Sequence, residues 1–434
     1  MKREQVEIKK LGINGEGIGY IHKKICFVEN AIPGEIVEVE IIENNRKFLK
    51  GKVVKTIQSS AHRVKRFCKE DENCQGCSLT PLAYSRQLSF KKDILKNALE
   101  KYTDFEVEKL PIRSTLASPK QKGYRSVVSL PVTYFNGKVR VGIYQRNSQY
   151  LTLMDQCCMQ DSLINDILVK VEDILNVHGV RDYNDKIKKG LRFMRVRNID
   201  GHIQILFVTG TNGLSEEVTK EIAQIENVDS LFLTINTSRY QEFELQGYKK
   251  IYGESKLPFT CFHQQYLYSV KSDFPINPEM EKNKLEMIQS LIHSEQSIIS
   301  LYCGVGLLEL SLNNNIVAID DKNYHIKDAQ DNAQFLRKDN VKFICRDIDE
   351  AVISQCKKKK FDCMIIRHDQ MSDSVKQSMV LSKIQDIIYV CDHPSSLARD
   401  LQDLNDYYQV ETIIPLDMLP YTAKVETIVK LHRR

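Results

Sequence analysis

Apolar and polar residues alternate through the first 58 residues of the chain, in short runs separated by glycines. The runs read VEIKKLGINGEGIGYI, KICFVEN, AIPGEIVEVEII and GKVVKTI. Alternation of this kind gives each segment one apolar face, which is typical of short strands at regular spacing. The pattern predicts a small antiparallel β-barrel over residues 1–60.

Residues 61–278 combine one helical pattern with several strand patterns. Apolar positions recur at helical spacing in AYSRQLSFKKDILKNALEKY, which predicts a long helix. Farther along, VVSLPVTYF, GKVRVGIY, GHIQILFVTG and DSLFLTIN have the composition of strands. We therefore expect a second domain of the α+β class that is built on a sheet.

Helical and strand patterns alternate from residue 279 to residue 434. The helical pattern EKNKLEMIQSLIHS precedes the strands SIISLY, IVAID, VKFIC, FDCMII and DIIYVC, with helices such as IKDAQDNAQFLR and SSLARDLQDL among them. Such alternation is typical of βαβ units and of a parallel, doubly wound sheet. The sequence thus predicts a multidomain protein with a β-barrel, a central α+β domain and a C-terminal Rossmann-like domain.

The composition is that of an ordinary globular protein. Of 434 residues, 42% are hydrophobic and 27% are charged, which excludes disordered, fibrous and small disulfide-stapled classes. No stretch approaches about 18 consecutive apolar residues, and the start MKREQVEIKK lacks the apolar core of a signal peptide. We expect a soluble cytoplasmic protein without a membrane partner, whose 12 cysteines are core residues, metal ligands or catalytic thiols rather than disulfides.

Basic residues are concentrated in two segments, although the net charge is only +5. Residues 44–66 contain eight lysines and arginines and no acid, and a small barrel with a basic strand is a common way to hold single-stranded nucleic acid. The side chains expected to face phosphates are Lys47, Lys50, Lys52, Lys55, Arg63, Lys65 and Arg66. The alternative for this segment is an ordinary solvated face. Residues 186–197 add six basic residues without an acid, compatible with a phosphate-facing edge.

Three cysteines, Cys68, Cys74 and Cys77, follow one another with the spacing C-x5-C-x2-C. Iron–sulfur clusters normally take four thiolates, and many tetrahedral zinc sites do as well. The fourth ligand is predicted to be Cys157, with its neighbour Cys158 as the competitor. The spacing by itself does not separate a 4Fe-4S cluster from zinc.

A glycine turn stands between a predicted strand and a predicted helix in ISLYCGVGLLELSL. Gly304 and Gly306 allow the backbone to approach a nucleotide-like ligand, and the helix N-terminus adds a favourable dipole. One strand later, the carboxylate of Asp320 is placed to accept hydrogen bonds from ribose hydroxyls, unless it caps the next helix. Asp347, after the following strand, is a candidate contact for an adenine.

In this order the motifs resemble those of the RNA uracil-5-methyltransferases, which combine an N-terminal TRAM barrel of the OB-like type, a 4Fe-4S cluster and a C-terminal S-adenosylmethionine domain. The resemblance covers essentially the whole chain. It rests on LGINGEGIGYI with FVENAIPGE, CKEDENCQGCSL, LYCGVG, YVCDHPSSLARDL and PLDMLPYTAKVET.

The resemblance implies a ribosomal or transfer RNA substrate, and we expect a monomer with no DNA partner. It also implies iron and sulfur rather than zinc, with Cys157 in QCCMQ as the fourth ligand. The residues that would contact S-adenosylmethionine are Tyr302, Gly304, Gly306, Asp320, Asp347 and Asn277.

In the reaction of this family, a cysteine thiolate adds to carbon 6 of uracil, because carbon 5 alone is a poor nucleophile. The enolate-like carbon 5 then attacks the methyl group of the cofactor. A carboxylate base removes the proton from carbon 5, and the thiolate leaves. The uracil must leave its stack to be reached. The resemblance places this base at Glu426, in PLDMLPYTAKVET. The alternative for this residue is an ordinary surface carboxylate on a strand.

The nucleophile is the main departure from the family. Where the family reads YVSCNP, residues 389–394 read YVCDHP, so Asp392 holds the nucleophile position. A carboxylate is a far weaker nucleophile toward an uncharged pyrimidine than a thiolate. Cys391 lies one residue earlier. It replaces the missing thiol only if the loop shifts register, because adjacent residues of an extended segment point in opposite directions.

Three further substitutions lie in the same region. FDLVILDPPR becomes FDCMIIRHDQ, which puts Arg367 where an aspartate positions the pyrimidine. FFQVN becomes DFPINP, which puts Pro275 at a cofactor-contacting glutamine and keeps Asn277, and Ser300 replaces the aspartate before LYCG. Two hypotheses follow: an active RNA uracil-5-methyltransferase, or a catalytically silent relative that keeps the scaffold and the metal cluster and binds RNA.

Overall fold

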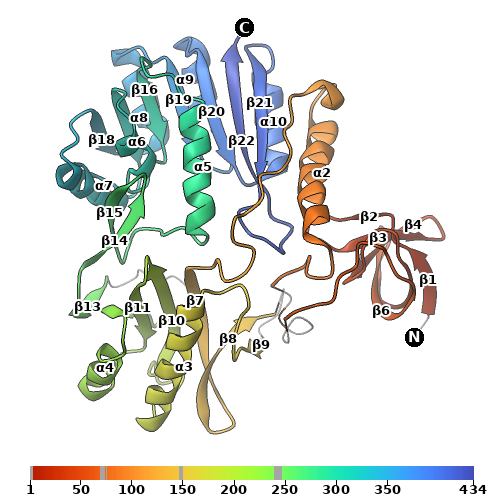
Figure 1. Cartoon of the computed structure of the whole chain (residues 1–434), viewed down its shortest axis with the longest axis vertical. Helices are drawn as coiled ribbons and strands as arrows, with labels where there is room; N and C mark the ends of the chain where they lie inside the picture. Colours follow the sequence, from red (N-terminus) through yellow and green to blue (C-terminus); the bar gives the residue numbers. More distant parts are fainter. Residues whose placement is uncertain (1–2, 69–73, 75, 146–149, 239–246) are drawn as a thin grey trace.

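The computed structural model describes residues 3–68, 74, 76–145, 150–238 and 247–434. Figure 1 shows three bodies: a β-barrel at one side, a sheet flanked by helices above, and a second sheet with two helices below. No helix within the described ranges is both long and apolar enough to cross a membrane.

The N-terminal barrel is a six-stranded sheet in the order β1-β5-β6-β4-β3-β2. Its strands are β1 (Arg3–Glu7), β2 (Lys10–Leu11), β3 (Gly17–Ile21), β4 (Lys24–Glu29), β5 (Ile36–Asn44) and β6 (Phe48–Gln58). Alternate apolar residues such as Val6, Val28 and Val37 fill the interior, as the sequence pattern predicts.

One pair of barrel strands differs from the prediction. β4 and β6 run parallel, so a wholly antiparallel barrel was wrong at this pair. The connection at residues 30–35 carries β5 past β4 and against β1, and the β5–β6 hairpin then returns β6 alongside β4. Because β5 runs opposite to both β4 and β6, these two strands run in the same direction.

The central body is a seven-stranded sheet in the order β13-β12-β11-β10-β7-β8-β9. Its strands are β7 (Val127–Phe135), β8 (Lys138–Tyr144), β9 (Leu151–Leu153), β10 (Leu191–Ile199), β11 (His202–Thr209), β12 (Val228–Ile235) and β13 (Lys249–Gly253). Helices α3 (Ser162–Val177) and α4 (Glu216–Ala223) pack on one face through residues such as Ile167 and Ile222. The α+β prediction for this part agrees with the observed elements.

The prediction of a phosphate-facing edge is wrong for the second half of the basic segment at residues 186–197, whereas Lys186 and Lys189 precede the strand and are exposed. β10 lies inside the sheet, paired with both β11 and β7. Arg197 is only 2% exposed and donates from Nη1 to the carbonyl of Ser269 (3.3 Å) and to Gln204 Oε1 (3.4 Å). Successive residues of a strand face opposite sides of the sheet. Arg197 lies on the side that faces the protein interior rather than solvent.

The C-terminal body is a seven-stranded sheet in the order β18-β17-β16-β19-β20-β22-β21. Five strands are parallel, namely β16 (Ile298–Leu301), β17 (Ile316–Asp320), β18 (Val341–Cys345), β19 (Cys363–Arg367) and β20 (Asp386–Cys391). The antiparallel hairpin of β21 (Tyr408–Leu416) and β22 (Glu426–Arg433) completes the sheet.

Helices cover both faces of this sheet. One face holds α5 (Pro278–Ser290), α6 (Leu307–Ser311) and α7 (Asn323–Leu336), together with the hairpin of β14 (Lys256–Cys261) and β15 (Gln264–Ser269). The other face holds α8 (Ile348–Lys358), α9 (Asp373–Leu381) and α10 (Pro394–Leu404). The strand order reverses between β16 and β19, and ligands of doubly wound sheets bind at the carboxyl ends of the strands beside such a reversal. The predicted Rossmann-like fold is confirmed.

A long helix from the middle of the chain also packs on the C-terminal body. Helix α2 (Tyr84–Tyr102) lies against α10, and its Leu95 and Leu99 join the core of the parallel sheet. A short 3-10 helix, η1 (Val107–Lys109), follows it. Lys91 of α2 forms an ion pair with Asp417, and both side chains are completely buried. The domain boundaries at residues 60 and 278 stay a prediction.

Candidate active site at the carboxyl ends of the parallel strands

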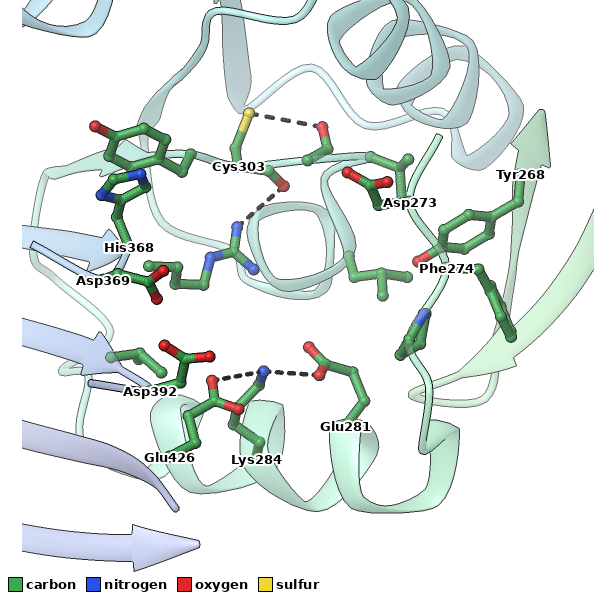
Figure 2. A pocket seen from close by; sticks show the side chains of 17 residues that line it. Tyr268, Asp273, Phe274, Glu281, Lys284, Cys303, His368, Asp369, Asp392 and Glu426 are labelled. Carbon is green, nitrogen blue, oxygen red and sulfur yellow. Dashed lines mark hydrogen bonds and ion pairs between the residues drawn. The ribbon is translucent and has the colours of Figure 1, made fainter. Parts of the chain in front are cut away.

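A cavity of about 350 Å³ opens at the reversal point of the strand order. It lies between the glycine turn after β16, the ends of β19 and β20, helix α5 and the start of β22 (Figure 2). Its charged lining residues are Asp273, Glu281, Lys284, Arg367, Asp369, Asp392 and Glu426. The sequence prediction had named three of these seven, Arg367, Asp392 and Glu426, as site positions.

The glycine turn has the predicted place between β16 and α6. Gly304 and Gly306 have φ angles of +59° and +80°, a region that side chains disfavour. A Cβ atom on Gly306 would lie 2.9 Å from Phe343, whereas one on Gly304 would meet no atom within 4 Å. Tyr302, also at φ +59°, stacks on His368 with a centroid separation of 4.2 Å. The turn therefore presents bare backbone to open space in the cavity.

Asp320 ends β17 but does not line this cavity. Its carboxylate accepts hydrogen bonds from the backbone amides of Gly304 (3.0 Å) and Lys322 (2.9 Å), and it contacts His325 Nδ1 at 3.2 Å. Lys322, not Asp320, is the N-cap residue of α7. Asp320 thus ties the glycine turn to the next strand, and at 3% exposure it keeps little accessible surface.

His325 lies between two carboxylates and is almost fully buried. Burial alone lowers the pKa of His325, but Asp273 (3.4 Å) and Asp320 outweigh burial and raise this pKa to about 9. The folded protein therefore holds a proton that the unfolded chain releases near its ordinary value of 6.5.

We expect this proton to contribute about 3 kcal/mol to stability below pH 6.5, a contribution that disappears as the pH rises to about 9. In urea unfolding at pH 6 and pH 9.5, His325→Gln should remove most of the loss that the wild type shows at high pH. His178→Gln, at a surface pair with Glu221, is the control and should change little. Equal pH dependence in wild type and His325→Gln would contradict this assignment.

Two other predicted cofactor contacts are engaged in internal hydrogen bonds. Asp347 caps helix α8 by accepting from the amide of Glu350 (3.0 Å) and lies outside the cavity. Asn277 caps α5 through Met280 N (3.2 Å), and its amide nitrogen donates to Ser118 Oγ and to the carbonyl of Met418. Asp347 thus fixes the start of α8, and Asn277 joins the start of α5 to the segments at Ser118 and Met418.

Strand β20 presents Asp392, not Cys391, to the cavity. Val390 and Asp392 line the cavity, whereas Cys391 and Tyr389 pack in the core on the opposite face. Cys391 is 2% exposed, and burial raises the pKa of its thiol to about 11. The expected alternation of side chains thus holds, and Cys391 is an uncharged core thiol in this arrangement.

Asp392 shares its corner with a second carboxylate and a histidine. Ligand atoms of Asp369, Asp392 and His393 lie within 4.8 Å of one another, and His393 Nε2 is 3.5 Å from each carboxylate. Burial and the adjacent Asp369 raise the pKa of Asp392. Asp392 Oδ1 is buried and has no hydrogen-bond partner among the described residues.

Arg367 and Ser300 belong to one buried network. Arg367 Nη2 donates to Glu309 Oε1 (2.7 Å) and to the carbonyl of Cys303 (3.0 Å), and Ser300 Oγ donates to the same Glu309 oxygen (2.6 Å). Glu309 has no exposed surface. The two substitutions are therefore linked by a third residue, which the sequence analysis missed because Glu309 lies inside the apolar run LLELS.

Glu426 begins β22 and faces the cavity, as predicted. Lys284 Nζ lies 3.0 Å from Glu426 Oε1 and 2.7 Å from Glu281 Oε2 (Figure 2). Burial raises the pKa of Glu426, and Lys284 opposes this rise. Neither Glu281 nor Lys284 was predicted, although their spacing of three residues puts both on one face of α5.

A smaller cavity of about 230 Å³ adjoins the first. Ile276, Met418, Leu419 and Val425 give it apolar walls. It shares Glu426, together with Asp392, Glu281 and Pro275, with the larger cavity. The site therefore has a polar part beside the glycine turn and an apolar part on the other side of Asp392 and Glu426.

Two of the four predicted metal ligands, Cys77 and Cys157, lie in one aromatic cluster. Cys77 and Cys157 are partly buried against Tyr124 and Tyr421, whereas Cys158 is exposed. Arg125, next to Tyr124 in the chain, has a buried Nε without a hydrogen-bond partner among the described residues. A free buried donor beside two cysteines suits an anionic thiolate-bound group. Residues 69–73 and 75 of the cysteine loop lie outside the described residues.

The basic barrel strand is mostly open to solvent. Lys47, Lys52, Lys55 and Lys65 are exposed, as phosphate contacts require. Arg63 differs, since its guanidinium pairs with the fully buried Glu35 (2.5 Å). We therefore remove Arg63 from the predicted phosphate contacts, because its charge holds the turn between β4 and β5 in place.

Comparisons with known proteins agree with this architecture. The TRAM domain family matches residues 2–54, and the family described as tRNA (Uracil-5-)-methyltransferase matches residues 83–434. An uncharacterized RNA methyltransferase of Bacillus cereus is 32% identical over 99% of this chain and 96% of its own length. One of Streptococcus pyogenes serotype M1 is 29% identical over 99% of this chain and 98% of its own length.

A crystal structure of Pyrococcus abyssi tRNA (uracil-54, C5)-methyltransferase, in complex with S-adenosyl-L-homocysteine, has the same fold. The TM-score is 0.79 at 23% identity, over 99% of this chain and 100% of that one. The arrangement of barrel, central sheet and parallel sheet is thus shared across the whole length.

Proposed function

The chain belongs to the tRNA (Uracil-5-)-methyltransferase family, and on that premise we propose that it is an S-adenosylmethionine-dependent methyltransferase acting on carbon 5 of a uridine in tRNA or rRNA. The observation that carries the proposal is one cavity lined by both the glycine turn and Glu426. The methyl donor and the proton acceptor must both reach carbon 5 of the uridine. This cavity connects the glycine turn, where the donor would bind, with Glu426, which would accept the proton.

The polar part of the site fits the methyl donor. S-adenosylmethionine supplies an electrophilic methyl group when it is bound. The open space above Gly304 leaves its backbone accessible, and Tyr302 borders the same space. Asp320 uses three of the roughly four acceptor positions of a carboxylate internally. We assign Asp320 to the cofactor mainly because it holds Gly304 in place.

The apolar part suits the flat face of a flipped pyrimidine. Glu426 lies between the two parts and takes the proton from carbon 5 after methyl transfer. Lys284, 3.0 Å away, opposes the rise in the pKa of Glu426 that burial causes, and it fixes the direction of the carboxylate. Asp392 is the side chain that faces carbon 6, so turnover through this weak nucleophile is slow unless Cys391 enters by a shift of the loop.

A second candidate is a catalytically silent relative that binds RNA. The observation that favours it is the orientation of Cys391, which faces the core as an uncharged thiol while Asp392 takes its place at the cavity. The exposed lysines of the barrel would then neutralise phosphates, so RNA affinity should fall steeply with salt. The two candidates share the fold and the RNA partner and differ in cofactor binding.

Calorimetric titration of S-adenosylmethionine into anaerobically purified protein separates them. We expect micromolar binding that Asp320→Ala abolishes and that Asp373→Ala, at the exposed start of α9, retains. Methyl transfer to bulk tRNA and rRNA should then be measurable, and its survival in Cys391→Ala would exclude the shifted loop. No binding by folded, metal-loaded protein would establish the silent candidate.

We also propose a 4Fe-4S cluster on Cys68, Cys74, Cys77 and Cys157, with Arg125 beside it. The free buried Nε of Arg125 supports this choice. The cluster would tie the central sheet to the segment around Tyr421, because Cys77, Cys157 and Tyr421 share one apolar cluster. Visible absorption with iron and zinc counts decides between this cluster and zinc.

A further inference from the structure

The main cavity holds more negative than positive charge. Five carboxylates line it, on Asp273, Glu281, Asp369, Asp392 and Glu426, against the two cations Lys284 and Arg367. The charge of Arg367 is already balanced by the buried Glu309 outside the lining. Lys284 bridges Glu281 and Glu426, and Asp273 pairs with Lys322 (3.1 Å). Asp369 and Asp392 are left without a lysine or arginine partner among the described residues.

These two carboxylates are placed side by side at the ends of β19 and β20 (Figure 2). Adjacent carboxylates repel one another unless a proton or a cation lies between or beside them. Asp392 Oδ1 is buried without a hydrogen bond among the described residues, and His393 Nε2, on a half-exposed ring, is 3.5 Å from each carboxylate. Lys424, which lines the adjoining cavity with Asp392, acts on this carboxylate from beyond ion-pair distance. The corner is therefore built to stabilise a positive charge that enters the cavity.

The proposed reaction brings such a charge to this corner and removes it there. The sulfur of S-adenosylmethionine is a cationic sulfonium. The methyl carbon is transferred to carbon 5, the C–S bond breaks, and its electron pair stays on sulfur, which becomes a neutral thioether. Carbon 5 is bonded to carbon 6, which Asp392 faces, and it lies within reach of Glu426. In this arrangement the sulfur would lie within a few bond lengths of Asp392.

We propose that Asp369 and Asp392 make this pocket bind S-adenosylmethionine in preference to S-adenosylhomocysteine. The inference rests on the proposed function, and it assigns a role to two substitutions that weaken the covalent chemistry. Both ligands share the adenosine and amino acid parts, so the difference in their affinity isolates the charge on sulfur. The sulfur of the product S-adenosylhomocysteine is neutral, so the two carboxylates bind the product more weakly than the substrate. This difference favours release of the product.

The test is calorimetric titration of both ligands, separately, into full-length metal-loaded protein in the presence of EDTA, so that no divalent cation neutralises the pair. A charge a few ångströms away at an effective dielectric constant near 20 is enough for about a tenfold preference. We expect about tenfold tighter binding of S-adenosylmethionine by the wild type, and a ratio near one in Asp392→Asn.

Two further variants make the result specific. Asp369→Asn should reduce the preference in the same way, because Asp369 belongs to the same pair. Asp373→Asn removes an exposed carboxylate at the start of α9, outside the cavity, and should leave the ratio unchanged. Melting temperatures of all variants show whether each one is folded. The Asn substitutions keep the size of the side chain, so loss of fold is not the expected result.

Equal dissociation constants for the two ligands in the wild type would overturn this inference and leave the proposed function standing. A wild-type preference that survives in both Asp392→Asn and Asp369→Asn would overturn it as well, since the charge would then come from elsewhere. Failure of both ligands to bind would overturn the proposed function, and this inference with it.

Discussion

Asp392→Cys is expected to raise the rate of methyl transfer to RNA by at least about 100-fold, which corresponds to about 2.7 kcal/mol of activation free energy. The side chain at position 392 faces the cavity that Glu426 also lines. A thiolate there adds to carbon 6 of a pyrimidine far more readily than a carboxylate. Single-turnover transfer of a labelled methyl group to total tRNA and rRNA measures the change.

The control for this gain is the double variant Asp392→Cys with Cys391→Ala. Cys391 packs in the core on the opposite face of β20, so its removal should leave the gained activity intact. RNA that contains 5-fluorouridine gives a second measurement, because fluorine at carbon 5 would block the proton removal proposed for Glu426 and would trap the covalent adduct. An Asp392→Cys protein that binds cofactor but shows neither methyl transfer nor an adduct would contradict the proposed roles of both residues.

Much of the fold was predictable because each segment carries its own periodicity. The alternation in residues 1–58 and the helix–strand rhythm after residue 279 are local patterns, and they gave the correct elements. The direction of β6 next to β4 was not predictable, because it depends on which strand β5 pairs with. For the same reason the segment at residues 186–197 was expected at an edge, since the charge of a segment does not reveal that its strand lies inside a sheet.

The site shows the same division between local and spatial information. Gly304, Asp392 and Glu426 were predictable because each lies in a recognisable short motif. Lys284 and Glu309 were not, since a lysine on a polar helix and an acid in an apolar run have no meaning in sequence until their partners are known. Glu309 is explained only by Arg367, which lies 58 positions away in the chain and 2.7 Å away in space.

The residues that depart from the family pattern in this cavity contact one another or share a partner. Arg367 and Ser300 share Glu309 as a common partner, and Asp392 and Asp369 form one pair. Burying Arg367 without Glu309 would reduce the free energy of unfolding by several kcal/mol. Each of these two side chains therefore needs the other for the fold to stay stable. The cavity therefore keeps a defined internal charge arrangement, which a pocket relaxing toward random sequence would not be expected to build.

The segment that leads into Glu426 depends on a buried charge. Lys91 of α2 pairs with Asp417, and neither side chain has any exposed surface. Tyr84 donates to the same carboxylate (2.7 Å), and Lys91 also donates to the carbonyl of Leu419 (3.1 Å). This network fixes the start of the loop between β21 and β22, the loop that also contains Tyr421 of the cysteine-bearing cluster.

Lys91→Met is expected to destabilise the protein by about 3–5 kcal/mol, because it leaves the carboxylate of Asp417 buried without a cation. The double variant Lys91→Met with Asp417→Asn should recover a large part of this loss, since no unpaired charge then remains. Urea unfolding of both variants measures the two effects. Lys109→Met, which breaks the exposed pair with Glu106, is the matched control and should change stability little. A loss in Lys91→Met no larger than in this control would show that the pair is not buried in solution. The loop that positions Glu426 would then be held by its other contacts, such as the hydrogen bond from Asn277 Nδ2 to the carbonyl of Met418 (3.0 Å).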